Sequence, residues 1–245
     1  MGSPPQSRQE EHDATQRALF SDYSPPLLRQ ARERQDRIIR QRFAGRRLAF
    51  ADLGCGDGYH ASMLAPGCEY YHAFELAPAM AQMSRERFAR ENLTKARIFE
   101  TDLSICDLGD YTYDVVLCMY FTPGNFRDVS NDLSLYTDDY LDHNPVFTKI
   151  VGRFYRRLRP AGCLLLTVYR DNEAAEQAQW DLYRNSQQEP VTPRGSRFVA
   201  TREGFWSARW TRASMLSNLR DAGIADDGVE FHELNTIAWL VEIRR

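Results

Sequence analysis

Five short apolar segments alternate with amphipathic segments through the middle of the chain. The intervening segments 78–92 and 145–158 place apolar side chains at the spacing of one helix face. Strands that alternate with helices in this way predict βαβ units and a parallel sheet. Because the apolar segments are continuous, we expect this sheet to be covered on both faces. The five predicted strands lie within residues 48–54, 69–76, 96–103, 113–120 and 162–169.

The two ends of the chain have different patterns. Residues 1–16 are polar and contain prolines, which predicts a disordered leader. Residues 26–43 predict a helix that ends near Gly45, and its arginine-rich surface is either a solvated face or a lid over an anionic ligand. Residues 211–224 predict another helix. Two alternating runs then fill residues 229–245, as an antiparallel hairpin does.

The composition is typical of a globular domain. Of the 245 residues, 43% are hydrophobic and 27% are charged, which excludes collagen-like and wholly disordered chains. The formal net charge of −3 provides no strong basic field for nucleic acid. No apolar run approaches the ~18 residues of a membrane span, and the first residues lack the apolar core of a signal peptide. Five scattered cysteines without zinc spacing predict reduced thiols in a cytoplasmic protein.

A glycine-rich loop, DLGCGDG at residues 52–58, directly follows the first predicted strand. Its three glycines permit positive φ angles and a close approach of a ligand to the backbone. The Gly-Lys-Ser/Thr of a P-loop is absent, and the spacing G-x-G-x-G differs from that of dinucleotide sites. Asp52 would repel a pyrophosphate but attract an ammonium or sulfonium group. We therefore expect a nucleoside ligand that carries a charged amino-acid tail.

Two further acids stand at the ends of predicted strands. Glu75 ends the second strand, where nucleotide-binding α/β sheets place an acid that accepts hydrogen bonds from ribose hydroxyls. Asp102 ends the third strand, where a carboxylate can accept a hydrogen bond from an adenine amino group. Open α/β folds bind ligands at the carboxyl edge of the sheet, so both acids support a nucleoside site there.

These motifs together resemble the class I S-adenosylmethionine-dependent methyltransferases over residues 48–170. The matching segments are ADLGCGDG, HAFEL, FETDL, YDVVLCMYF and LRPAGCLLLTV. The resemblance implies an α/β, Rossmann-like fold with a seven-stranded, mostly parallel sheet, helices on both faces and a C-terminal antiparallel hairpin. We expect a leader and lid helix at 1–47 and a methyltransferase domain at 48–245. The segments 121–144 and 171–210, which fit the sheet poorly, would be acceptor-site or cap insertions.

The resemblance also implies a cofactor, S-adenosyl-L-methionine, with S-adenosyl-L-homocysteine as its product. The residues that would hold its methionine part are Asp52, Gly54, Cys55, Gly56 and Gly58. Glu75 would hold the ribose, with Leu76 beside the adenine. Asp102 would face the adenine amine, with Leu103 beside the ring. The methyl-transfer site would be lined by Cys118, Met119 and Tyr120.

Three side chains are candidates for catalytic roles. Tyr120 is one candidate, because the resemblance places it in the methyl-transfer site. Tyr23 lies in the segment DYSPP before the first helix, where small-molecule members of the family often place a lid. His143 is either a general base or a surface histidine.

Three further residues are candidates for binding the acceptor. Asn125 lies in TPGNF, which is locally similar to the segment after strand four in amino-acid betaine-forming N-methyltransferases, although the same residues also suit a turn. Trp206 and Arg209 belong to an aromatic and arginine-rich stretch, 198–212, that lines a pocket or forms a strand. The acids at 128, 132, 138, 139 and 142 lack histidine or asparagine at ligand spacing, so we expect solvated charges and no metal.

The function that we predict is methyl transfer to nitrogen or oxygen of a small molecule. Such a transfer needs alignment of donor and acceptor and exclusion of water, and it needs no dedicated nucleophile. Neither the Asn/Asp-Pro-Pro-aromatic motif of amino-methylating nucleic-acid enzymes nor a Pro-Cys dipeptide is present. The alternatives are an RNA- or protein-directed methyltransferase and a catalytically silent cofactor-binding scaffold. We expect neither a membrane nor a nucleic-acid partner, and the oligomeric state stays open.

Overall fold

The computed structural model describes residues 24–128 and 132–245. The predicted leader at 1–16 and the candidate lid residue Tyr23 lie outside the described residues.

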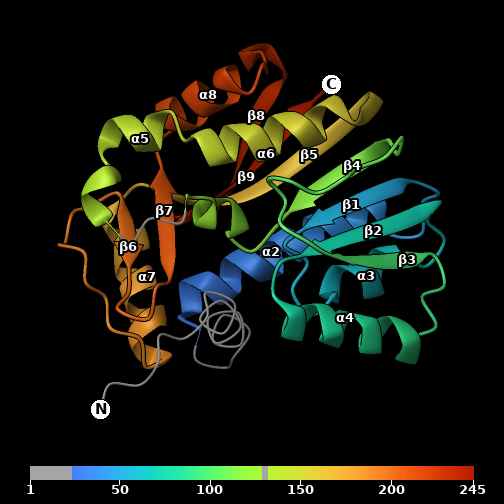
Figure 1. Ribbon diagram of the computed structural model, residues 1–245, viewed down its shortest axis with the longest axis horizontal. Coiled ribbons are helices and arrows are strands. Elements are labelled where there is room, and N and C mark those ends of the chain that lie inside the picture. Colours follow the sequence, from blue (N-terminus) through green and yellow to red (C-terminus); the bar gives the residue numbers. More distant parts are fainter. Residues whose placement is uncertain (1–23, 129–131) are drawn as a thin grey trace.

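A mostly parallel sheet forms the centre of the fold (Figure 1). Its parallel strands are β1 (Ala49–Leu53), β2 (Tyr70–Glu75), β3 (Ala96–Glu100), β4 (Tyr113–Cys118) and β5 (Leu158–Arg170). They lie in the order β3-β2-β1-β4-β5. The C-terminal hairpin is formed by β8 (Val229–Asn235) and β9 (Ala238–Arg244), and β9 pairs antiparallel with β5. The predicted Rossmann-like sheet and its antiparallel hairpin are confirmed.

The sheet has one strand pair more than the seven strands expected. For residues 171–210 we expect an acceptor-site or cap insertion, with either a pocket lining or a strand at 198–212. The structure shows strands there: β6 (Phe198–Ala200) and β7 (Trp206–Trp210), which pair antiparallel. The reason is the length of β5, which continues past the end of β4. Beyond the end of β4, the free edge of β5 pairs with β7, which runs parallel to it at Tyr169 and Arg170. The same long strand begins at Leu158, four residues before the predicted start.

Helices cover both faces of the sheet, as expected (Figure 1). One face carries α6 (Pro145–Arg156) and α8 (Arg212–Asp221), and the other carries α3 (Tyr59–Leu64) and α4 (Pro78–Arg90). The strands alternate their side chains between two apolar clusters: Phe50 of β1 faces one cluster, whereas Ala51 faces the other. This burial on both sides explains the continuous apolar pattern of the strands. No helix among the described residues is long and apolar enough to cross a membrane.

The two insertions pack against each other beyond the end of β5. A third apolar cluster joins Tyr136 and Leu141 of the first insertion to Phe198 and Trp206 of the second. Helix α5 (Asp138–Asp142) lies in the first insertion and helix α7 (Glu173–Asn185) in the second. The two segments therefore form one packed unit.

Helix α2 (Pro26–Phe43) lies across the sheet and is joined to the C-terminal hairpin by a buried carboxylate. Its residue Arg42 donates two hydrogen bonds, of 2.7 and 2.8 Å, to the two oxygens of Glu242 in β9. Arg244 and His232 also contact this carboxylate, which is only 2% exposed. The bidentate pair fixes one end of α2 against the sheet.

Replacing Glu242 by glutamine should lower the free energy of unfolding by about 1–3 kcal/mol at neutral pH, because Arg42 loses a charged partner. Hydrogen bonds from Arg42 hold the pKa of Glu242 at about 2, below the value of about 4.3 in an unfolded chain. A carboxyl whose folded pKa is lowered stabilises the fold above its unfolded pKa. This stabilisation is lost as the pH falls from about 4.3 through the folded pKa of about 2.

Urea denaturation of native protein and Glu242→Gln at several pH values measures this difference. The matched control is Glu230→Gln on the adjacent strand, where the exposed carboxylate should contribute no more than about 0.5 kcal/mol. A difference between native protein and Glu242→Gln that stays constant down to acid pH would contradict the assignment.

Candidate functional site

The glycine loop connects β1 to α3 at the carboxyl edge of the sheet. Gly54, Gly56 and Gly58 all have positive φ angles, between 59° and 77°, which explains why glycine stands at each position. A Cβ atom at Gly54 would lie 2.6 Å from Cγ2 of Thr122, in the segment after β4. The loop is therefore packed directly against that segment.

Glu75, at the end of β2, holds the glycine loop through its side chain. One carboxylate oxygen accepts a hydrogen bond from Gly56 N at 2.8 Å. The other accepts bonds from the backbone N–H groups of Leu76 and Ala77, each at 2.9 Å. Burial raises the pKa of Glu75, and these three N–H groups oppose that rise. The acid predicted to bind ribose thus also fixes the backbone around the site.

Asp52 lies beneath the loop and is 1% exposed. Its Oδ2 accepts a hydrogen bond of 2.6 Å from the hydroxyl of Tyr71 and lies 3.9 Å from Nδ1 of His60. Burial raises the pKa of Asp52, while His60 and the Tyr71 hydroxyl oppose the rise. The first turn of α3 therefore places a titratable ring beside the acid that precedes the glycines.

The backbone after β4 adopts an uncommon conformation at two successive aromatic residues. Tyr120 has φ 51° and Phe121 has φ 66°, both in the left-handed region that side chains disfavour. The hydroxyl of Tyr120 donates a 2.7 Å hydrogen bond to Oδ2 of Asp36 in α2. The ring of Phe121 stacks on Tyr169 with centroids 3.9 Å apart. These tertiary contacts stabilise the strained turn, and strain of this kind is concentrated at functional sites.

A buried polar network links α2 to this turn and to the glycine loop. Gln35 is fully buried; its amide nitrogen donates to Asp36 Oδ1 at 2.9 Å, and its oxygen accepts from Thr167 at 2.5 Å. Asp36 Oδ1 also lies 3.3 Å from Nε2 of His60. Burial opposes ionisation of Asp36, but the contacts with His60, Tyr120 and Gln35 outweigh it and lower the pKa of this carboxyl.

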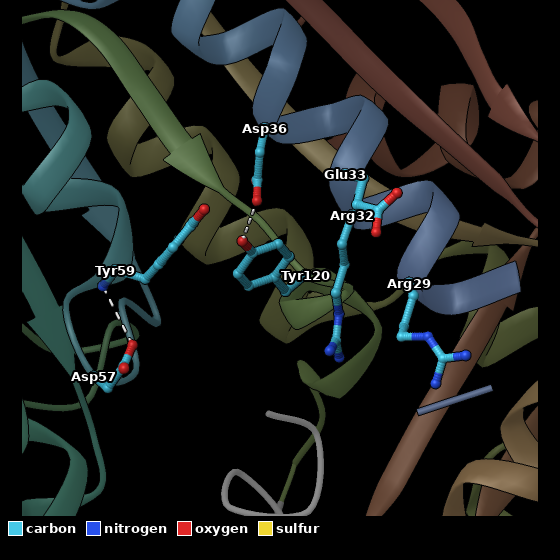
Figure 2. A pocket seen from close by; sticks show the side chains of 7 residues that line it. All are labelled: Arg29, Arg32, Glu33, Asp36, Asp57, Tyr59 and Tyr120. Atoms are coloured by element: carbon cyan, nitrogen blue, oxygen red, sulfur yellow. Dashed lines mark hydrogen bonds between the residues drawn. The ribbon is translucent and has the colours of Figure 1, made fainter. Parts of the chain in front are cut away.

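A pocket of about 260 Å³ opens between α2, the glycine loop and the turn after β4. Figure 2 shows the side chains of α2 on one side and those next to the glycine loop on the other, with the ring of Tyr120 between them. The lining residues are Arg29, Arg32, Glu33, Asp36, Asp57, Tyr59 and Tyr120.

The pocket has charged groups of both signs. Arg29 and Arg32 extend from α2, and the Arg32 guanidinium lies 5.2 Å from the ring centroid of Tyr120. Arg29 donates to the backbone oxygen of Ser24, and Arg32 donates to the hydroxyl of the same residue. Asp57, on the opposite side, is paired with Arg87. The arginine-rich helix predicted as either a solvated face or a lid thus faces a pocket with part of its surface.

The predicted adenine residues are found at the carboxyl edge beyond β2 and β3. Leu76 is 37% exposed, and Asp102 and Leu103 are half-buried. Asp102 forms a local turn by accepting a 2.7 Å hydrogen bond from Ser104 N. Their contact with an adenine stays a prediction.

The residues that end β4 are more deeply buried. Cys118 and Met119 have no more than 2% exposure, and burial raises the pKa of the Cys118 thiol well above its usual value. Cys55 in the glycine loop is buried as well, and burial raises the pKa of its thiol too. These cysteines are held as thiols, which suits packing and disfavours nucleophilic chemistry.

One catalytic candidate, His143, and two acceptor-binding candidates, Trp206 and Arg209, lie away from the pocket lining. His143 follows α5 at the protein surface, where its Nδ1 pairs with Asp221 at 2.7 Å. Trp206 packs within the cap, and Arg209 is buried there with hydrogen bonds to Asp171 and Gln179. Of the two alternatives for residues 198–212, the structure therefore shows a strand at Trp206 and Arg209.

The remaining acceptor-binding candidate, Asn125, ends the short 3₁₀ helix η1 (Thr122–Asn125). This helix packs on both the glycine loop and β7. The residue is half-buried. Its role in binding the acceptor stays a prediction.

Several residues of the site were not identified from the sequence. Gln35 follows the buried residues Leu28 and Ala31 at helical spacing and precedes Ile39, so a polar side chain on this apolar stripe was a usable signal. Asp36 and His60 gave no comparable signal, because only the packing of α2 on α3 brings them together.

The comparisons with known proteins agree with this geometry. Residues 50–137, about a third of the chain, match a family model described as a methyltransferase domain. A comparison with curated protein sequences finds no match.

The fold resembles that of several solved methyltransferases. One is the 1,6-didemethyltoxoflavin-N1-methyltransferase of Burkholderia thailandensis, with 15% identity, a TM-score of 0.57, and coverage of 100% of this chain and 93% of that one. Another is an amino pentose methyltransferase from Micromonospora echinaspora, with 19% identity, a TM-score of 0.53, and coverage of 100% and 99%. The CcbJ methyltransferase of Streptomyces caelestis has 15% identity and a TM-score of 0.57, with coverage of 92% and 98%.

The matched domain contains the glycine loop, the acid that ends β2 and the turn after β4, all at one edge of a Rossmann-like sheet. Residues 50–137 are thus similar to a methyltransferase domain, and the chain has the Rossmann-like fold of solved methyltransferases that bind S-adenosylmethionine or S-adenosylhomocysteine.

Proposed function

We propose that this enzyme methylates a nitrogen or oxygen atom of a small molecule that binds in the pocket between α2 and the turn after β4. The observation that carries the proposal is the position of Tyr120, which is one of the residues predicted to line the methyl-transfer site and also forms a wall of the pocket. The pocket volume of about 260 Å³ suits a small molecule or part of one.

The residues of the carboxyl edge suit the charge of the cofactor. Buried carboxylates of Asp52 and Glu75 lie at the glycine loop, and Arg87, near the loop, is paired with Asp57. This arrangement disfavours a pyrophosphate and favours a cationic ligand. When bound, S-adenosyl-L-methionine supplies an electrophilic methyl group on a sulfonium. Asp52 and the glycines would hold its methionine part, and Glu75 its ribose.

Tyr120 would position the acceptor rather than deprotonate it. Burial raises the pKa of Tyr120 far above its usual value, and the Asp36 carboxylate adds to this rise. The phenol therefore keeps its proton at neutral pH and donates it to Asp36. Its side chain, which lines the pocket, would orient a ligand there. Alignment and exclusion of water by α2 and the aromatic walls would then provide most of the catalysis.

The charge of the pocket makes an RNA-directed enzyme the weaker alternative. Three carboxylates, those of Glu33, Asp36 and Asp57, stand beside two arginines in the lining. A phosphate backbone is bound mainly through uncompensated basic groups. The similar structures from Burkholderia thailandensis and Micromonospora echinaspora are described as a 1,6-didemethyltoxoflavin methyltransferase and an amino pentose methyltransferase, which favours a small molecule here.

The division of the chain follows from the same proposal. We assign α2 as a lid that forms part of the acceptor pocket, residues 48–245 as the methyltransferase domain, and the two packed insertions as its cap. All five cysteines are buried and unpaired, which supports a reducing compartment such as the cytoplasm.

Transfer of a labelled methyl group separates the acceptor classes. Purified enzyme with labelled S-adenosyl-L-methionine should label low-molecular-weight compounds of a metabolite extract and leave total RNA and a protein extract unlabelled. Labelling of RNA or protein alone would contradict the small-molecule proposal. No transfer to any extract, despite binding of S-adenosyl-L-homocysteine, would favour the silent scaffold.

Replacing Glu75 by alanine should weaken binding of S-adenosyl-L-homocysteine by roughly 30-fold or more, because buried ribose hydroxyls and the Gly56 N–H lose their acceptor. Calorimetry measures the affinity, and circular dichroism checks that the variant is folded. Glu100→Ala is the matched control, since Glu100 pairs in register with Glu75 but bonds Arg85 on the surface. Equal affinities of the Glu75→Ala variant and the native protein would contradict the ribose assignment.

Replacing Tyr120 by phenylalanine should lower kcat about tenfold while it changes the affinity for S-adenosyl-L-homocysteine by less than about threefold. The variant loses the hydrogen bond to Asp36 but keeps the ring. Because Tyr120 acts here without losing its proton, the pH profile of kcat/KM should keep its shape in the variant. Disappearance of a titration from that profile would show that Tyr120 is a general base instead.

A further inference from the structure

His60 is a buried titratable side chain for which the proposed methyl transfer has no role. It lies in the first turn of α3 and is 3% exposed. Its Nε2 is 3.3 Å from Asp36 Oδ1, and its Nδ1 is 3.9 Å from Asp52 Oδ2. A neutral imidazole has one N–H, whereas an imidazolium presents a proton from each nitrogen. The position between two carboxylates therefore favours the charged ring.

The groups around His60 come from every element packed against it. Helix α2 supplies Asp36, β1 supplies Asp52, and the glycine loop supplies Asp57, which is already paired with Arg87. The ring of Tyr120 lies 4.9 Å from that of His60 and the ring of Tyr59 lies 5.6 Å from it. Burial would lower the pKa of His60, but the carboxylates outweigh burial and raise it.

Both ion pairs that the structure gives to Asp36 and Asp52 are formed with this one ring. Asp36 lines the pocket, and Asp52 directly precedes the glycine loop. Any positive charge that binds at the loop is therefore attracted by carboxylates that His60 already partly neutralises. When the ring loses its proton, these two carboxylates lose the one ion pair that each of them forms with a described residue.

We propose that His60 determines how strongly the cofactor site prefers a cationic ligand: its imidazolium and the sulfonium of the methyl donor compete for the charge of Asp36 and Asp52. Deprotonation of His60 favours the cationic donor over the neutral product. This inference rests on the proposed placement of the cofactor at the glycine loop. Because the coupling is reciprocal, binding of the donor also drives a proton from His60.

The ratio of two affinities isolates this effect. S-adenosyl-L-methionine and S-adenosyl-L-homocysteine share their amino, carboxyl and nucleoside groups, so their binding differs through the methyl group and its sulfonium charge. The ratio of the product Kd to the donor Kd should rise on the order of three- to tenfold between about pH 5.5 and about pH 8.5. In His60→Gln the ratio should be independent of pH. A flat ratio in native protein, or an equal rise in the variant, would overturn the proposal.

His232→Gln is the matched control. His232 also pairs with a carboxylate, that of Glu242, but it lies on the C-terminal hairpin. This variant should keep the pH dependence of the native protein. If it abolishes that dependence as His60→Gln does, the effect does not belong to His60.

A measurement on the native protein serves if His60→Gln does not fold. Calorimetry in two buffers of different ionisation enthalpy counts the protons released on binding, and the donor should release more than the product near the pKa of His60. Equal release for both ligands overturns the inference about His60. Failure of both ligands to bind the native protein would instead overturn the proposed function.

Discussion

The carboxylate of Asp36 is the group on which the arrangement of the site depends. It accepts hydrogen bonds from Gln35 in its own helix and from Tyr120 after β4, and it pairs with His60 in α3. Through these contacts one side chain holds α2 against both the glycine loop and the turn that follows the fourth strand. The pocket exists because these three segments are fixed at this distance from one another.

The same contacts offset the strain of the turn. Two successive aromatic residues in the left-handed region cost on the order of 1–3 kcal/mol each. The bond from Tyr120 to Asp36 and the stacking of Phe121 on Tyr169 hold them in place. A turn of this shape directs the backbone away from β4 and leaves the Tyr120 ring as a wall of the pocket. The strained turn thus lies where we propose that the acceptor and the methyl group are aligned.

The buried acids of the protein are balanced in different ways according to their position. Glu242 is far from the pocket and is neutralised by arginines, which makes it a structural anchor. Glu75 accepts hydrogen bonds from three backbone N–H groups. Asp52 and Asp36 share one histidine, whose charge can change near neutral pH. Buried carboxylates are therefore gathered at the glycine loop, where we expect the sulfonium.

The sequence of residues 171–210 did not decide whether Trp206 and Arg209 line a pocket or belong to a strand. Trp206 and Arg209 have the residue types of a binding surface, but β7 buries both of them. The open backbone edge of β5 beyond β4 decides this, because unpaired strand groups near the core favour addition of another strand. The two insertions, separated in the chain, then share one apolar cluster around Tyr136 and Phe198.

The sequence by itself determined the Rossmann-like sheet, its hairpin and the acids at its carboxyl edge. Apolar periodicity and glycine spacing are local signals, and parallel strands bring Asp52 and Glu75 to one edge in any such sheet. Only the tertiary structure decided that Gln35, Asp36 and His60 belong to the site. Those side chains meet through the packing of α2 on α3, and no local pattern encodes contacts between segments that only the folded chain brings together.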